Sequence, residues 1–291
     1  MVSNNTKILK KILSNLKIKK GDNIYLGVDI FKLFDTLNDK GITRYHFVKQ
    51  ILNFFLDNLG KKGNLIIPVF NFKSVREKKF NQRLSSSDSG ALGTLLLKDY
   101  YKYRIGNPFY SFLCFGKKKN FYKKVQDSHV VGNDSLWKYF IKDNFYLLTL
   151  GHHYSRSFTH IHHLEYLSKV KYRYDKEFKI DCTDMYNNKK KEKITLYVRN
   201  RKLCEYSAIT KTCDNLLLKK KFARFYRHKK LICFKLDIKK SSQLLLKDLK
   251  NKVPKLVSVI KKNKKNYNII SHRNIDFIEK KCLNNKINHY K

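Results

Sequence analysis

Short apolar runs alternate along this chain with helical segments, and this alternation constrains its fold more than any other feature. Residues 23–28, 64–70 and 145–151 have the length and apolar content of buried strands. Between the first two runs, Phe47 to Leu59 carries apolar side chains at helical spacing. A strand–helix–strand order favours right-handed crossovers and a mainly parallel sheet. We therefore expect an α/β protein.

The rest of the pattern fits one large domain followed by a basic tail. A chain of 291 residues can bury a sizeable core. Residues 181–205 are polar and predict a hairpin or surface excursion. We assign residues 1–257 to one domain and the lysine- and asparagine-rich residues 258–291 to a loosely packed tail. Further predicted elements are helices over residues 7–19, 91–101 and 244–256, and a strand over 231–236.

The chain is strongly basic, with 64 Lys+Arg against 23 Asp+Glu and a net charge of +41. Such a charge is compatible with a nucleic-acid or anionic-membrane partner. Most of the excess is lysine spread from Lys7 to Lys291, however, in a composition with three alanines and three prolines that is typical of AT-rich coding DNA. No recognisable nucleic-acid-binding module is present. The pattern therefore favours a solvated basic surface, with a nucleic-acid or anion-binding role kept as the alternative.

The cysteines and apolar runs indicate the cellular compartment of the protein. Six scattered cysteines include Cys114 and Cys233 inside apolar runs, as expected of reduced core thiols. No apolar run reaches membrane-spanning length, and lysines interrupt the N-terminal segment where a signal peptide would be apolar. We expect a soluble, cytoplasmic protein.

His162 and Glu165 are the most informative pair of polar residues. Residues three apart share one face of a helix, so the two side chains can touch. The carboxylate can then hold the imidazole in one tautomer and leave its other nitrogen to act as a base. The pair follows a buried strand and Gly151, a position where α/β proteins often place their chemistry. A solvated surface pair is the alternative that the spacing alone leaves open.

Other chemistries have weaker support. A metal cluster is possible where five histidines crowd together, but their spacing lacks the two-histidine, one-glutamate helix motif of zinc hydrolases. No G-x-S-x-G motif is present either. The loop at residues 85–90 begins a helix and is either an ordinary cap or a phosphate or pantetheine contact. The crowded histidines are His152, His153, His160, His162 and His163.

In order along the chain, several segments resemble the aminoglycoside 3-N-acetyltransferase family. Residues 159–166 are similar to that family's T-x-x-H-x-x-E segment, and residues 172–176 match the Y-R-x-x-K stretch that follows it. The resemblance runs from about residue 7 to residue 257. The other similar segments are residues 21–26, 66–70, 89–92, 104–111, 132–136 and 147–151.

The resemblance implies a three-layer fold, with a central mainly parallel or mixed sheet and helices on both faces. It implies acetyl-CoA-dependent N-acetylation of an amino sugar without a metal, with His162 as general base and Glu165 orienting it. Thr159 is the implied substrate contact. The implied coenzyme contacts are Asp29, Phe70, Ser87, Ser89 and Arg104.

Two departures from the family pattern bear on the ligands. The family's first strand ends in a His-Ser-Ser-Leu element that contacts the coenzyme, but here these positions are Gly27, Val28, Asp29 and Ile30. The family's role is antibiotic resistance, and aminoglycosides are polycations that need carboxylates, whereas this chain is strongly basic. The charge favours an anionic amino sugar, as in polysaccharide metabolism. A homo-oligomer is compatible with this reading, and a non-catalytic relative that keeps the fold is the alternative.

Overall fold

A seven-stranded mixed sheet forms the centre of the computed structural model, which describes residues 4–37, 41–125 and 127–260. The strand order is β10-β11-β6-β1-β2-β5-β4. The pairs β1–β2 and β1–β6 are parallel, and the outer pairs are antiparallel. The strands are β1 (Asn23–Val28), β2 (Asn64–Pro68), β4 (Arg104–Gly106), β5 (Ser111–Gly116), β6 (Phe145–Leu150), β10 (Ala223–His228) and β11 (Leu231–Asp237).

The parallel centre is the part of the sheet that the alternation predicts, and the antiparallel β10–β11 pair has a local cause. Only Lys229 and Lys230 separate β10 from β11. A connection of two residues permits antiparallel pairing alone, since a parallel crossover needs a dozen residues or more. The sheet is therefore mixed, as the resemblance allows, and less parallel than the strand–helix alternation suggests.

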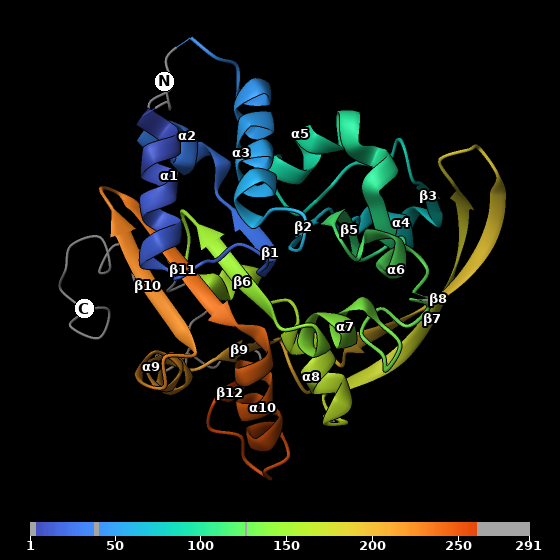
Figure 1. The fold of residues 1–291 in the computed structure, drawn as a ribbon. Helices are drawn as coiled ribbons and strands as arrows, with labels where there is room; N and C mark the ends of the chain where they lie inside the picture. The colour runs from blue at the N-terminus through green and yellow to red at the C-terminus, as the bar shows by residue number, and fades with distance from the viewer. Residues whose placement is uncertain (1–3, 38–40, 126, 261–291) are drawn as a thin grey trace.

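Helices cover both faces of this sheet and complete the three expected layers (Figure 1). Side chains alternate along each strand, so Ile24 and Leu26 of β1 pack into one core and Tyr25 packs into the other. The Ile24 core includes α1 (Asn4–Asn15), α2 (Ile30–Leu37), α3 (Arg44–Leu59) and α5 (Ala91–Tyr100). The Tyr25 core includes α7 (Leu136–Lys142), α8 (Ile161–Leu167) and α10 (Ile238–Leu249).

Two smaller sheets lie beside the central one. The strands β3 (Lys79–Asn81), β7 (Arg173–Thr183) and β8 (Lys189–Arg199) form one of them. The long β7–β8 hairpin projects from the body at the right of Figure 1. Strands β9 (Tyr206–Ile209) and β12 (Val257–Ile260) form the other. The remaining elements are α4 (Lys73–Glu77), α6 (Lys119–Lys123), α9 (Lys211–Lys219) and the 3₁₀ helices η1 (Tyr101–Tyr103) and η2 (Tyr154–Ser157).

Several boundaries differ from the sequence expectation, among them the first helix, expected over 7–19 and observed as Asn4–Asn15. The polar hairpin begins at Arg173, eight residues before the excursion expected at 181. The helix expected over 244–256 is instead α10, which starts earlier because the Asp237 carboxylate caps it by accepting the Lys240 N–H at 2.9 Å. Asp248 accepts backbone N–H groups from beyond the helix and so turns the chain toward β12. Residues 258–260 belong to that strand, and residues 261–291 of the expected tail lie outside the described residues.

Two glycines allow the segment between β6 and α8 to cross the ends of the central strands. A Cβ at Gly27 would lie 2.4 Å from Ser157 Oγ and 3.3 Å from His152 Nε2, so the absence of a side chain lets η2 pack close to β1. Gly151 has φ +90°, a conformation that other residues rarely adopt, and it turns the chain at the end of β6. The start of α8 is thereby held beside the carboxyl ends of β1 and β6.

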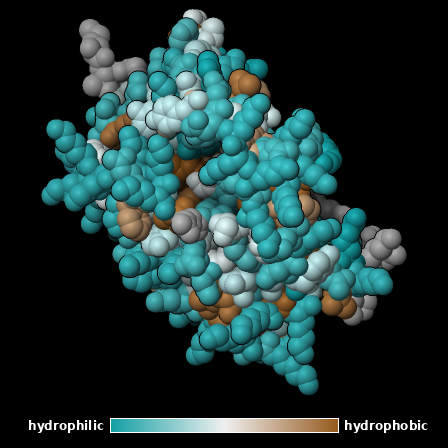
Figure 2. Space-filling model, turned by 90° about the vertical axis from the view of Figure 1, so that its right-hand side faces the viewer, coloured by the Kyte–Doolittle hydropathy of each residue, from teal (hydrophilic) through white to brown (hydrophobic). Residues whose placement is uncertain are grey.

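The surface is mainly hydrophilic and the described cysteines lie in the core, as the composition predicts. Hydrophilic side chains cover most of the face shown in Figure 2, and hydrophobic residues appear in scattered small patches. The five cysteines in the described part of the chain are buried and unpaired, as expected of core thiols, whereas Cys282 lies outside it. None of the helices within the described residues is long and apolar enough to span a membrane.

Candidate active site

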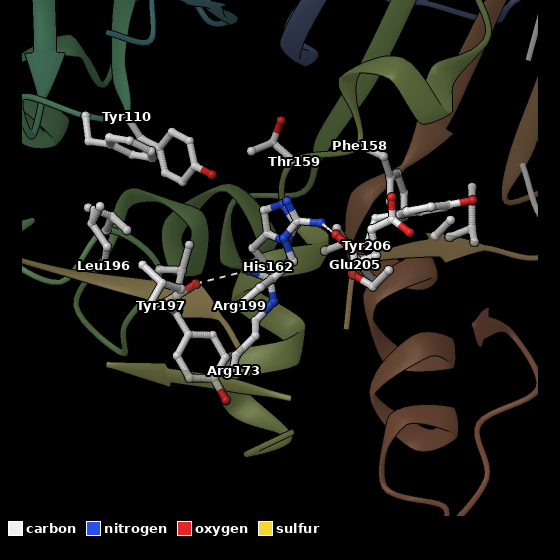
Figure 3. A pocket seen from close by; sticks show the side chains of 18 of the residues that line it. Tyr110, Phe158, Thr159, His162, Arg173, Leu196, Tyr197, Arg199, Glu205 and Tyr206 are labelled. Atoms are coloured by element: carbon white, nitrogen blue, oxygen red, sulfur yellow. Dashed lines mark hydrogen bonds between the residues drawn. The ribbon is translucent and has the colours of Figure 1, made fainter. Parts of the chain in front are cut away.

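A cavity of about 980 Å³ opens beside the start of α8. Its wall combines the segment leading into α8 with the end of β8 and the whole of β9. His162 lies within it, with Thr159 above and Tyr197 below in the view of Figure 3. The cavity therefore brings together residues far apart in the sequence around the histidine that the spacing singles out.

His162 and Glu165 form the contact that their spacing predicts. Nδ1 of the imidazole lies 2.8 Å from Oε2 of the carboxylate, one turn along α8. The Glu165 side chain is fully buried, whereas 28% of the His162 side chain is exposed. A solvated surface pair is therefore excluded, because the carboxylate is buried. The histidine lines the cavity, and the carboxylate lies behind it.

Three further groups hold the Glu165 carboxylate. Tyr172 Oη donates to Oε1 at 2.9 Å, and Ser207 Oγ donates to the same oxygen at 2.5 Å. Arg173 Nε lies 2.7 Å from Oε2. Burial by itself raises the pKa of a carboxyl group, but the contacts with His162, Arg173 and Ser207 outweigh it and lower the pKa of Glu165 to about 2. Glu165 is therefore an anion at neutral pH.

An ionised Glu165 determines the tautomer of His162. A carboxylate only accepts hydrogen bonds, so the proton in this contact belongs to Nδ1 of the imidazole. Arg173 Nη2 also lies 3.0 Å from Nδ1, but a guanidinium only donates and cannot bond a protonated nitrogen. The lone pair is left on Nε2, which has no hydrogen-bond partner among the described residues.

The surroundings of His162 also keep it neutral. Burial lowers the pKa of its imidazole, and the positive charges of Arg173 and Arg199 lower it further, while the contact with Glu165 works in the opposite direction. The net effect is a pKa below the ordinary 6.5. At neutral pH the ring is uncharged and can accept a proton.

The other crowded histidines each have a separate place. His152 Nε2 lies 3.0 Å from Ser157 Oγ, His153 Nε2 lies 3.4 Å from an Asp214 oxygen, and His163 Nδ1 lies 2.8 Å from the Val131 carbonyl oxygen. His160 is fully buried, and burial lowers its pKa to about 3. Within residues 4–37, 41–125 and 127–260, no three metal-ligating side chains converge on one point.

Of the remaining candidates, Thr159 lines the cavity and the five implied coenzyme contacts do not. Asp29 caps α2 by accepting the Lys32 N–H at 3.1 Å. Ser89 Oγ accepts the N–H of the buried Phe70 at 2.8 Å and lies 2.9 Å from Ser87 Oγ. Ser87 and Ser89 thereby organise the loop before α5, but neither hydroxyl caps this helix, whose N-terminal cap residue is Gly90. Coenzyme contact by this loop stays a prediction.

Arg104 is likewise engaged within the protein. Its side chain is buried, its Nε donates to Ser111 Oγ at 2.9 Å, and Nη1 and Nη2 donate to the carbonyl oxygens of Ser85 and Val69. Burial lowers the pKa of Arg104 to about 10. The guanidinium therefore ties the Ser85 loop to β5 and to the end of β2.

Replacing Arg104 by alanine should destabilise the fold by about 3 kcal/mol, because it leaves buried carbonyl groups without their charged donor. The free energy of unfolding from urea titration measures this effect. Arg76→Ala is the matched control, since its side chain is 74% exposed and should change stability by less than about 0.5 kcal/mol. Unchanged stability in the Arg104 variant, combined with weaker acetyl-CoA binding, would instead show that Arg104 contacts the coenzyme.

Sequence reasoning did not select the residues around Glu165 as site residues. Tyr172 and Arg173 lie within the Y-R-x-x-K stretch, so the resemblance covers them without assigning them a role. Ser207 is 42 residues from Glu165 and reaches it only because β9 is placed against α8. A single serine in a loop-rich segment gives no signal of that contact.

Comparisons with known proteins give the family and the fold. The family model described as aminoglycoside 3-N-acetyltransferase matches residues 45–243. A search among curated proteins gives no match.

Solved structures share the fold at low sequence identity. Sisomicin-bound AAC-VIa has a TM-score of 0.65 at 11% identity, covering 84% of this chain and 97% of its own. AAC-IIIb with CoASH has a TM-score of 0.63 at 16% identity, covering 82% and 93%. The YokD protein from Bacillus subtilis has a TM-score of 0.60 at 15% identity, covering 83% and 97%. The family match extends over most of the chain and includes both His162 and Glu165, and the chain therefore belongs to the aminoglycoside 3-N-acetyltransferase family of enzymes.

Proposed function

We propose that this enzyme transfers the acetyl group of acetyl-CoA to the amine of an amino sugar, with His162 as the general base. The observation that carries the proposal is the 2.8 Å contact between His162 Nδ1 and a buried, ionised Glu165, which leaves Nε2 as the available base. Family membership supports acetyl-CoA as the acyl donor. Solved relatives with the same fold bind CoASH in one case and sisomicin in another.

The cavity is compatible with these two substrates. Its volume of about 980 Å³ lies at the upper end of the range for small-molecule sites. Aromatic side chains such as Tyr110 and Phe158 offer apolar contact area for bound substrates. Acetyl-CoA supplies the thioester from which the acetyl group is taken.

His162 and Glu165 handle the proton of the reaction. Nε2 of His162 accepts a proton from the attacking amine as the carbon–nitrogen bond forms and the carbon–sulfur bond breaks. Glu165 stabilises the resulting imidazolium through Nδ1, and His162 can return the proton to the departing sulfur. The Thr159 hydroxyl, on the wall beside His162, is placed to hydrogen-bond the acceptor. Direct transfer needs no nucleophile from the protein.

Calorimetric titration with acetyl-CoA, followed by thiol-release assays on a panel of amino sugars, tests this function. We expect acetyl-CoA binding in the micromolar to millimolar range and acceptor-dependent release of free thiol. No binding over this range, or thiol release that is independent of every amine, would reject the proposal.

The protonation of His162 gives a further test that needs no known acceptor. Diethyl pyrocarbonate modifies only neutral imidazole, so the modification rate of His162, followed by peptide mass spectrometry, reports its ionisation. Since burial and Arg173 lower the pKa of His162, we expect half-maximal modification below pH 6.5 and a plateau at neutral pH. A midpoint above pH 7 would mean that the imidazole is charged under working conditions.

A further inference from the structure

Four arginines line the cavity around His162, namely Arg156, Arg173, Arg199 and Arg201. Only 11 of the 64 basic residues in the chain are arginines, and no lysine of the described residues lines this cavity. The lysine excess of the surface therefore does not account for the charge in the cavity wall. A guanidinium binds carboxylate or phosphate through two parallel hydrogen bonds, which an ammonium group cannot do. The concentration of arginine here indicates recognition of an anion.

Part of this positive charge is already compensated. Arg173 forms its ion pair with Glu165 at 2.7 Å and donates to the Tyr197 carbonyl oxygen. Arg199 lies directly opposite Arg173 in the β7–β8 ladder, where like charges repel. Arg199 donates to the backbone carbonyl of Glu205. Arg199 therefore has no acidic side chain as a partner among the described residues, and an anion bound in the cavity would supply one.

Arg201 adds to the uncompensated charge. Its side chain is exposed, and its guanidinium has no hydrogen bond or ion pair with any residue in the described part of the chain. Glu205 is the one acidic side chain of the described residues in the cavity wall. Figure 3 shows Arg199 beside His162, so an anion bound there would lie next to the amine being acetylated.

We propose that the acceptor is an amino sugar carrying a phosphate or carboxylate group, which Arg199 and Arg201 bind while His162 faces the amine. This inference rests on the proposed function and names its substrate class. A polycationic aminoglycoside would bring several positive charges against these guanidinium groups and meet a single acidic side chain in the wall. An anionic acceptor turns the same repulsion into attraction.

Acetyl-CoA also carries phosphates, so the experiment must separate the two sources of anion. The test compares wild-type enzyme with the double variant Arg199→Gln and Arg201→Gln. Binding of acetyl-CoA is measured by calorimetry, and binding of acetylpantetheine, which lacks phosphates, is measured in parallel. Thiol release is then measured for glucosamine, glucosamine 1-phosphate, glucosamine 6-phosphate, muramic acid and gentamicin. Arg76→Gln, at an exposed position outside the cavity, is the control.

For at least one of the phosphorylated or carboxylated sugars, we expect wild-type kcat/KM to exceed that for glucosamine by about 10- to 100-fold, the range for charge-assisted hydrogen bonds. The double variant should lose this preference and bind acetyl-CoA within about threefold of wild type, and the Arg76 control should keep both properties. An Arg199→Lys, Arg201→Lys enzyme should keep only part of the preference, because lysine supplies charge without the paired donors.

Two results would overturn the inference. One is a wild-type enzyme that binds acetyl-CoA but acetylates glucosamine or gentamicin as well as every anionic sugar. The other is a double variant that loses affinity for acetyl-CoA and not for acetylpantetheine, which would assign the arginines to the phosphates of the donor. If wild-type enzyme does not bind acetyl-CoA at all, the proposed function fails, and the acceptor inference fails with it.

Discussion

Replacing His162 by alanine should lower the rate of acetyl transfer by about 10²–10⁴-fold, the usual contribution of a well-placed general base. The loss follows from chemistry, because Nε2 of His162 has no hydrogen-bond partner among the described residues and is the atom that would accept the proton. Acetyl-CoA affinity should change little. Single-turnover thiol release at saturating acetyl-CoA measures the rate of the chemical step.

His46→Ala is the matched control for this variant. His46 is exposed on α3 and lies outside the cavity, so its removal should leave the transfer rate unchanged. A His162→Ala enzyme with the wild-type rate would show that another group takes the proton. Partial recovery of that variant's rate by added imidazole would support the assignment of the base.

Replacing Glu165 by glutamine should lower the transfer rate by up to about 10⁴-fold, the scale seen when the carboxylate behind a catalytic histidine becomes an amide. The amide no longer stabilises the imidazolium that forms on His162, and it no longer requires the proton to reside on Nδ1. Glu165 also raises the pKa of His162, so its loss should move the midpoint of His162 modification to a still lower pH. A rate loss without this pH shift would contradict an electrostatic role for Glu165.

The same carboxylate is part of the fold, and Glu165→Ala should cost about 3–5 kcal/mol because Arg173 would keep a buried, unpaired charge. Urea titration gives this value. Glu177→Ala is the control, since Glu177 pairs with Lys193 on the exposed hairpin and should change stability by less than about 1 kcal/mol. Equal stability of the two variants would mean that Arg173 finds another partner.

The parts of the fold that could be predicted from the sequence are those that produce a local periodic pattern of apolar residues. The buried strands β1 and β6 and the helix α3 follow from apolar spacing, and the His162–Glu165 contact follows from helical geometry over three residues. The full set of partners around Glu165 could not be derived in this way. Ser207 reaches the carboxylate through the tertiary placement of β9, which no local pattern encodes.

For the residues expected to contact the coenzyme, the sequence gives a signal but not its meaning. Arg104 and Ser89 lie in segments that resemble the family, but a resemblance does not distinguish a ligand contact from a structural hydrogen bond. Arg104 is buried and donates to the carbonyl oxygens of Ser85 and Val69, which gives it a structural role, while its contact with the coenzyme stays a prediction. Similarly, the net charge of +41 indicates an anionic partner only weakly. The arginines of the cavity wall, which only the structure brings together, indicate where an anionic group of that partner would bind.

The most direct test of the His162–Glu165 pair is nitrogen-15 NMR of the His162 ring at neutral pH. We expect the chemical shifts of a neutral imidazole with a protonated Nδ1 and an unprotonated Nε2, because the ionised Glu165 accepts the Nδ1 proton. In the Glu165→Gln enzyme, this preference for one tautomer should weaken. A ring in the wild-type enzyme that is charged, or that carries its proton on Nε2, would contradict the assignment of His162 as the base.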